Sequence, residues 1–206
     1  MTDLQTCVAP TFLGLADLLA SAPPATWDTP SLCAGWGVRH VVAHMTMAGR
    51  LTPEQFGAEM AAAGGDFDVL SDTVAARDAR LPLDDLLAGL RSPSLHAWQP
   101  PGGGAAGALG HAVIHSLDAT IPLDAAPTAP PDALHAILDH LTAAHGTIFG
   151  LDLTGLGLRT PDGRWTWGDG DRIVEADAHH MVALLAGRTL PDGRVLGPAR
   201  EAGRVR

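Results

Sequence analysis

The sequence contains no lysine, and its 13 basic residues are all arginine. Its formal net charge is −10, so it offers no excess of clustered cations for contacting a phosphate backbone. We therefore expect no nucleic-acid partner. Arginine without lysine, together with abundant alanine and glycine, is typical of the coding habit of a high-GC bacterium.

Cysteine is also scarce, because only Cys7 and Cys33 occur in the 206 residues. Two cysteines are too few for a disulfide framework and match no zinc-ligand spacing, so we expect both thiols to be reduced. For Cys33, we favour a structural role over a nucleophilic one. Asp3 and Asp17 interrupt the N-terminal segment, which therefore does not resemble a signal peptide. No run of about 18 apolar residues predicts a membrane-spanning helix, so a cytoplasmic protein without a membrane partner is expected.

Aromatic residues make up only 4% of the chain, whereas 46% of it is hydrophobic, much of that alanine and leucine. This composition has few β-branched runs and favours helices. Apolar periodicity predicts helices over residues 9–22, 38–50, 53–60, 69–80, 83–91 and 132–149, and a closing helix over 174–188.

A hairpin is predicted where Pro161-Asp-Gly163 separates residues 156–160 from residues 164–167. The change from helical to strand periodicity near Gly155 divides the chain. The sequence thus predicts a mainly α protein, with a helical bundle over residues 1–124 and a small C-terminal α+β domain over residues 125–206.

The most informative segment is His111-Ala-Val-Ile-His115-Ser-Leu-Asp118, which follows the helix breaker Pro100-Pro-Gly-Gly-Gly104. Residues four apart lie on the same face of a helix, so both imidazoles can reach one ion. Asp118 is the only formal charge between Pro100 and Leu123. A helix without a charged outer face is expected to be buried, and its polar side chains are expected to point into a cavity. This pattern predicts a metal site.

A catalytic metal site usually has three protein ligands and one open position. On the helix predicted over residues 38–50, His44 lies at the edge of the apolar stripe and is the best third ligand. His40 lies one turn earlier and is expected to be solvated, although a separate His40–His44 pair is an alternative. Asp118 is expected to orient an imidazole or, alternatively, to pair with an arginine near the helix end. The simplest alternative is that these histidines are buried without a metal and bond to backbone carbonyls.

Three segments together resemble a known family. They are Trp27 followed by Ser31-Leu-Cys-Ala-Gly-Trp-Gly-Val-Arg-His-Val-Val-Ala-His44, the segment His111-Ala-Val-Ile-His115-Ser-Leu-Asp118-Ala-Thr-Ile-Pro-Leu123, and Trp165-Thr-Trp-Gly-Asp-Gly with Ala183-Leu-Leu-Ala-Gly-Arg188. These segments are similar to the mycothiol-dependent maleylpyruvate isomerase family of the DinB-like superfamily. The family has a metal-binding N-terminal domain, and here it would be followed by a short C-terminal domain.

The resemblance implies an up-down-down-up four-helix bundle in which His44, His111 and His115 bind Zn²⁺ or another divalent metal. It also implies mycothiol as the thiol cosubstrate. At position 111 the isomerase has a glutamate ligand, whereas this sequence has histidine. A neutral ligand leaves the ion more electropositive, so the resemblance implies the metal site more directly than it implies the isomerase reaction.

We therefore predict a metal-dependent transferase or isomerase that uses a low-molecular-weight thiol on a small electrophile. The metal would deprotonate the thiol for attack. A catalytically silent metal-binding or ligand-binding protein on the same scaffold is the alternative. A monomer or a homodimer is expected.

Overall fold

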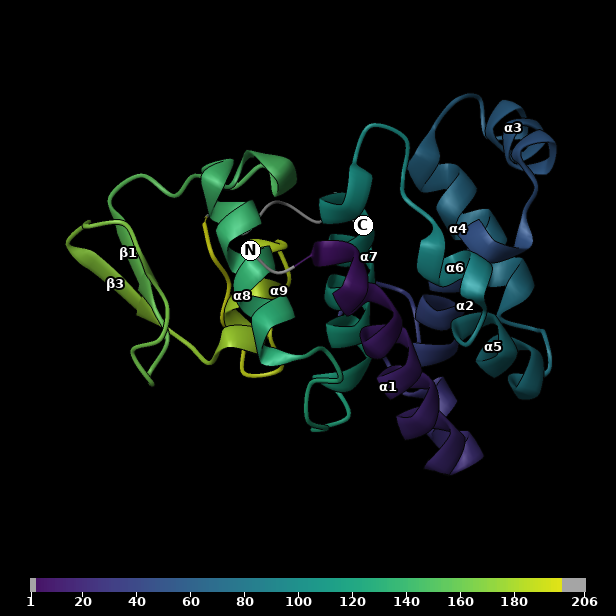
Figure 1. Cartoon of the computed structure of the whole chain (residues 1–206), viewed down its shortest axis with the longest axis horizontal. Coiled ribbons are helices and arrows are strands. Elements are labelled where there is room, and N and C mark those ends of the chain that lie inside the picture. Colours follow the sequence, from purple (N-terminus) through teal and green to yellow (C-terminus); the bar gives the residue numbers. More distant parts are fainter. Residues whose placement is uncertain (1–2, 198–206) are drawn as a thin grey trace.

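The central element of the fold is α7 (Gly104–Thr120), nearly all of whose residues from Ala108 onward are buried. The structure is a computed structural model that describes residues 3–197. Figure 1 shows α1 (Val8–Ser21) and α2 (Val38–Arg50) toward one end of the molecule, and α8 (Pro131–Ala143) and α9 (Ala178–Leu185) toward the other, with α7 between them. All four helices contact α7. A helix enclosed in this way has no outer face for charged residues, which accounts for their scarcity.

The other helices lie at the α2 end of the molecule, and the strands lie beyond α8 and α9 (Figure 1). The elements not yet named are α3 (Pro53–Ala62), α4 (Phe67–Asp78), α5 (Leu83–Leu90), α6 (Pro93–Ala97), β1 (Leu156–Arg159), β2 (Thr166–Trp167), β3 (Arg172–Glu175) and the 3-10 turns Leu4–Cys7, Pro24–Asp28 and Thr147–Phe149. The predicted fold class is confirmed, since the protein is mainly helical with a small sheet near its C-terminal end.

The second predicted helix matches α2 at both ends. Its apolar residues Val38, Val41, Val42 and Met45 have no exposed surface, because α2 packs against α4, α5 and α7. Burial of this face on three sides brings the next residue along the edge of the stripe, His44, into the interior.

The predicted hairpin is confirmed, with β1 and β2 antiparallel in the register Leu158 to Trp167. A third strand, β3, pairs with β1 in parallel and completes a sheet of order β2-β1-β3. The helix predicted over residues 174–188 is therefore wrong at its start, because Val174 belongs to β3 and α9 begins at Ala178. A four-residue strand whose partner is 16 residues away in sequence carries too little periodicity to be recognised.

The helix predicted over residues 132–149 is also too long. α8 ends at Ala143, and His145 and Gly146 then adopt φ values of 49° and 81°. Gly146 tightly approaches the backbone of Leu151, since a Cβ atom placed on it would lie 2.8 Å from that carbonyl oxygen. This turn separates α8 from the sheet.

Among the described residues, one helical stretch, Leu4–Ser21, is long and apolar enough to cross a membrane. Core helices of soluble proteins pass the same test of length and composition. Phe12, Leu15 and Leu19 have at most 1% exposed surface and belong to the main hydrophobic core, where α1 packs on α7 and α5. The structure thus uses this stretch as a core helix.

A single cluster of buried side chains runs from Cys7 to Leu196, so the C-terminal part packs on α7 through apolar surface. A second, smaller cluster of Met47, Leu70 and Val74 lies under α3 and α4. The division into domains over residues 1–124 and 125–206 stays a prediction.

The turn after α8 gives the first testable prediction. The control is Gly64→Ala, in the turn between α3 and α4. It places a side chain at a φ of 66° with nothing within 4 Å, and we expect it to lower the free energy of unfolding by about 1 kcal/mol. Gly146→Ala adds a close backbone contact at a φ of 81°, so we expect a loss of about 2–3 kcal/mol. Urea denaturation at constant m-value measures both, and equal losses would contradict the interpretation of the turn.

Candidate metal centre

Three histidines from two helices meet in the interior. His44 comes from α2, and His111 and His115 come from successive turns of α7. Their ring centroids lie 4.7 Å apart for His44 and His115, 5.1 Å for His111 and His115, and 5.3 Å for His44 and His111. One nitrogen of each ring lies within 4.8 Å of the corresponding nitrogens of the other two. The three residues predicted from sequence are therefore brought together.

His44 is held in place by α4 and by the loop before α2. The Ser71 hydroxyl lies 2.8 Å from His44 Nδ1. The indole of Trp36 packs against the His44 ring at a centroid distance of 5.2 Å, and its N–H donates to Asp72 on α4. With Nδ1 engaged by Ser71, Nε2 is the nitrogen of His44 that remains for a ligand.

His115 is fixed within its own helix. Its Nδ1 lies 2.9 Å from Asp118 Oδ2, an i,i+3 pair on the buried face of α7. Metal-binding histidines commonly donate their second N–H to a carboxylate in this way, which sets the tautomer and leaves Nε2 for the ion. The predicted orienting role of Asp118 fits this contact.

Asp118 also pairs with an arginine, as the alternative prediction had it, but not with one near the helix end. Arg188, 70 residues away in the turn after α9, donates from Nε to Oδ1 at 2.7 Å and from Nη2 to Oδ2 at 2.9 Å. Both side chains have at most 2% exposed surface. The Cys33 thiol donates to the same Oδ2 at 3.1 Å. A single carboxylate thus links α7, the Cys33 loop and the C-terminal part.

Cys33, His115 and Asp118 also bring their donor atoms within 4.8 Å of one another. The Arg188 guanidinium already contacts both Asp118 oxygens and approaches Cys33 Sγ to 3.7 Å. The positive charge beside this second group is therefore supplied by the Arg188 guanidinium. Neither Cys33 nor Cys7 forms a disulfide, in agreement with the expected reduced thiols.

The surroundings of the His111 ring indicate whether the three residues fit a metal ion. Its Nδ1 is buried and, within the described structure, has no hydrogen-bond partner. Leaving such an atom unsatisfied costs about 1–3 kcal/mol. Three imidazoles facing one another, one of them with an unsatisfied nitrogen, form a donor set that suits Zn²⁺ and other divalent transition metals.

The electrostatics favour neutral imidazoles. Burial, assisted by the neighbouring His115, lowers the pKa of His111 to about 3. Burial and the two neighbouring histidines lower the pKa of His44 well below its usual value. The Arg188 guanidinium and the His115 hydrogen bond outweigh burial and hold the pKa of Asp118 below its usual value. At neutral pH His44 and His111 therefore present uncharged nitrogens, and the nearby Asp118 carboxylate is ionised.

His40 lies outside this group. Its Nδ1 accepts the Gly37 backbone N–H at 3.3 Å, which closes the first turn of α2. Partial burial, with the adjacent Arg39 adding to it, lowers the pKa of His40. The geometry groups His44 with the α7 histidines and not with His40.

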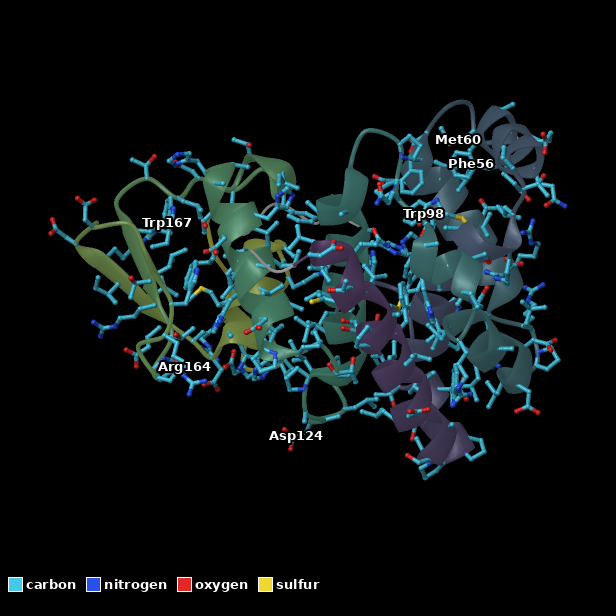
Figure 2. All side chains as sticks on the ribbon, in the orientation of Figure 1. Phe56, Met60, Trp98, Asp124, Arg164 and Trp167 are labelled. Carbon is cyan, nitrogen blue, oxygen red and sulfur yellow. The ribbon has the colours of Figure 1, made fainter. Side chains whose placement is uncertain are left out.

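An apolar cavity of about 570 Å³ opens onto the three histidines. Its other lining residues come from α2, α3, α4 and the segment before α7, and they are Met47, Ala48, Leu51, Thr52, Pro53, Phe56, Phe67, Ser71, Trp98, Pro100 and Pro101. Figure 2 shows Phe56 and Trp98 at this end of the molecule, with Met60 beside Phe56. Trp98 packs edge-on to His111 at a centroid distance of 5.5 Å. A cavity of this size can bind one small organic molecule.

A smaller cavity of about 220 Å³ reaches His111 and His115 from the direction of α8. It is lined in part by His140, Phe149 and Arg188. The two α7 histidines therefore border both cavities, whereas His44 borders only the larger one.

Sequence reasoning identified Asp118 but missed the other groups around the histidines. Ser71 lies on a helix with weak periodicity, and Arg188 is one of 13 arginines. The one available signal for Arg188 was the lone charge of Asp118 on a buried helix, which requires a cation from elsewhere in the chain. Trp98 stands outside the predicted helices, next to the short α6 that was not predicted.

Comparison with known proteins agrees with the resemblance seen in the sequence. Residues 12–99 match the family model of the mycothiol maleylpyruvate isomerase N-terminal domain. The match includes His44 but ends before the α7 histidines. None of the curated proteins is similar enough to match.

Two crystal structures share the fold. One is a histidine-to-alanine mutant of the mycothiol-dependent maleylpyruvate isomerase, with a TM-score of 0.56 and 17% sequence identity. The other is the crystal structure of the mycothiol-dependent maleylpyruvate isomerase, with a TM-score of 0.54 and 16% identity. Each match covers 95% of this chain and 94% of that chain. At such identities the similarity shows the fold alone.

The Asp118–Arg188 pair gives a prediction on stability. Asp118→Asn deprives a buried guanidinium of this carboxylate, and we expect a loss of about 3–5 kcal/mol in the free energy of unfolding. The matched control is Glu175→Gln, which breaks the exposed pair with Arg159 and is expected to change stability by less than about 1 kcal/mol. Urea denaturation measures both variants. A loss for Asp118→Asn as small as the control would contradict the assigned role.

The histidines give a prediction on pH, for protein kept metal-free with a chelator. The folded-state pKa of His111 lies below its unfolded value of 6.5, so below pH 6.5 the unfolded chain binds the proton and the folded chain does not. Stability is therefore expected to fall as pH falls, by about 2 kcal/mol at pH 5 from this group. Urea midpoints from pH 8 to pH 5 measure the slope. His111→Gln should flatten it, and an unchanged slope in this variant would refute the assignment.

Proposed function

We propose that this chain is a divalent-metal-dependent enzyme that uses a low-molecular-weight thiol on a small electrophile. The match of residues 12–99 to the mycothiol maleylpyruvate isomerase N-terminal domain, together with the similar fold of that isomerase, supports the proposal. The observation that carries the proposal is the meeting of three histidines beside an apolar cavity. The thiol proposed is mycothiol, and the metal proposed is Zn²⁺ or another divalent ion.

His44, His111 and His115 would hold the metal. Ser71 and Asp118 engage Nδ1 of His44 and of His115, so these two rings are oriented before an ion arrives. When bound, a divalent ion lowers the pKa of a coordinated thiol and makes thiolate available at neutral pH. Three protein ligands leave a coordination position open, as catalytic sites require.

The chain offers no carboxylate as a general base in the larger cavity. Among its described lining residues there is neither aspartate nor glutamate. Asp118 is buried behind His115 and occupied by Arg188, so it orients the ring and does not take a substrate proton. The thiol proton is therefore released to solvent through the open side of the cavity. What the protein contributes is the position of the thiol and an apolar enclosure for the electrophile.

The residue at position 111 sets this chain apart from the isomerase, which has glutamate there by the resemblance. With histidine the donor set is neutral, so a bound ion keeps its full double charge and acidifies a thiol more strongly. We therefore propose thiol transfer or thiol-assisted isomerisation as the class of reaction, without assigning maleylpyruvate as the substrate.

A catalytically silent metal-binding or ligand-binding protein is the second candidate. The observation in its favour is the missing general base. Such a protein would have the same metal site and cavity as the proposed enzyme but would catalyse no reaction. Purified protein that binds a divalent metal and mycothiol but transfers the thiol to no member of an electrophile panel would support it.

Metal analysis of protein purified without added metal tests the site. We expect about one divalent ion per chain, lost in His115→Ala together with any mycothiol-dependent activity. His40→Ala is the matched control, because His40 lies on the same helix as His44 but outside the cluster, and it should keep the ion. Elemental analysis and mycothiol titration by calorimetry provide the readouts. Equal metal content in His115→Ala and His40→Ala would refute the proposed ligands.

A further inference from the structure

We propose that the electrophile is an uncharged molecule with an aromatic or otherwise flat apolar body, and not an organic anion. This inference rests on the proposed function and concerns the larger cavity beside the three histidines. It specifies the substrate class that the cavity selects.

The lining of the cavity is the first argument. Its described residues include no arginine, lysine, aspartate or glutamate. Apart from the three histidines, the side chains with polar atoms are Thr52, Ser71 and the Trp98 indole, and the Ser71 hydroxyl is already engaged by His44. Away from the three histidines and the ion that they would hold, a carboxylate in this cavity would lose its water and meet no charged side chain, which costs several kcal/mol. A neutral apolar molecule has no such penalty.

The arginines near the site are committed elsewhere. Arg188 is 2% exposed at its side chain and makes two bonds with Asp118. Arg50, on the far side of α2, bonds to the Asp78 carboxylate and to backbone and hydroxyl oxygens of α2. Neither belongs to the lining of the cavity. The net charge of −10 further disfavours the approach of an anion.

Aromatic side chains define the shape that fits. Phe56 and Phe67 are 36% and 47% exposed, although they are large apolar residues, and both line the cavity. Trp98 lies nearer the histidines, in contact with His111. Figure 2 shows Phe56 and Trp98 on neighbouring segments at the same end of the molecule. Exposed aromatic rings at the mouth and an indole deeper inside suit a flat ring that stacks and passes inward.

A matched pair of probes tests charge alone: methyl 4-chloro-3,5-dinitrobenzoate and the corresponding free carboxylate. In both, thiolate sulfur forms a bond to the ring carbon that bears chlorine, chloride leaves with the electron pair, and the thiol proton passes to solvent. Binding is measured by quenching of tryptophan fluorescence in metal-loaded and in chelator-treated protein. Turnover is measured with mycothiol and divided by the uncatalysed rate of each probe.

We expect the ester to bind at least tenfold more tightly than the carboxylate in chelator-treated protein, where no ion attracts the carboxylate. Phe67→Arg adds a cation at the mouth of the cavity and should reduce or reverse this preference. Val69→Arg is the matched control, since Val69 lies on the same helix, is 48% exposed and does not line the cavity. It adds the same charge and should leave the preference unchanged.

The outcomes separate this inference from the proposed function. Equal or tighter binding of the carboxylate by chelator-treated unmodified protein overturns the inference, and metal-dependent thiol transfer by the metal-loaded protein would still support the function. A preference for the ester without any metal- or mycothiol-dependent turnover supports the inference as a statement about ligands and refutes the function. A shift caused by Val69→Arg as large as that caused by Phe67→Arg would also overturn the inference.

Discussion

The carboxylate of Asp118 is the point on which the site depends. It accepts two bonds from the Arg188 guanidinium and one from the Cys33 thiol, and it orients the His115 ring. A buried ion pair contributes little net stability, because removing two charges from water offsets their attraction. Its value here is geometric, since it brings three distant parts of the chain into one arrangement around a single histidine.

Because other helices enclose α7, its buried polar side chains require partners inside the protein. A helix surrounded on both sides holds polar groups only if each finds a partner inside, and here the partners are Ser71 for His44 and Asp118 for His115. The Nδ1 atom of His111 has none within the described structure. A metal ion on the three histidines, as proposed, would provide a reason for keeping this otherwise costly ring in the interior.

Local patterns in the sequence predicted most of the helices and selected the three histidines that meet in the structure. Periodicity located α2, and the i,i+4 spacing placed His111 and His115 on one face. The failures came where structure depends on distant partners or single backbone angles. β3 exists because β1 pairs with it, α8 ends because of a left-handed turn, and no periodicity distinguishes Arg188 among the arginines. The cavity likewise requires α3, α4 and Trp98 to meet in space.

The position of Arg188 in the chain has a consequence for synthesis. The three histidines are all present once α7 has been made, but the guanidinium that fixes Asp118 follows 70 residues later. On the ribosome, an early chain would therefore hold the imidazoles beside an Asp118 carboxylate that still lacks its guanidinium partner. Only when the segment after α9 docks does Asp118 acquire the contacts that fix it against His115, so the arrangement of the histidines is completed by nearly the last part of the chain to be made.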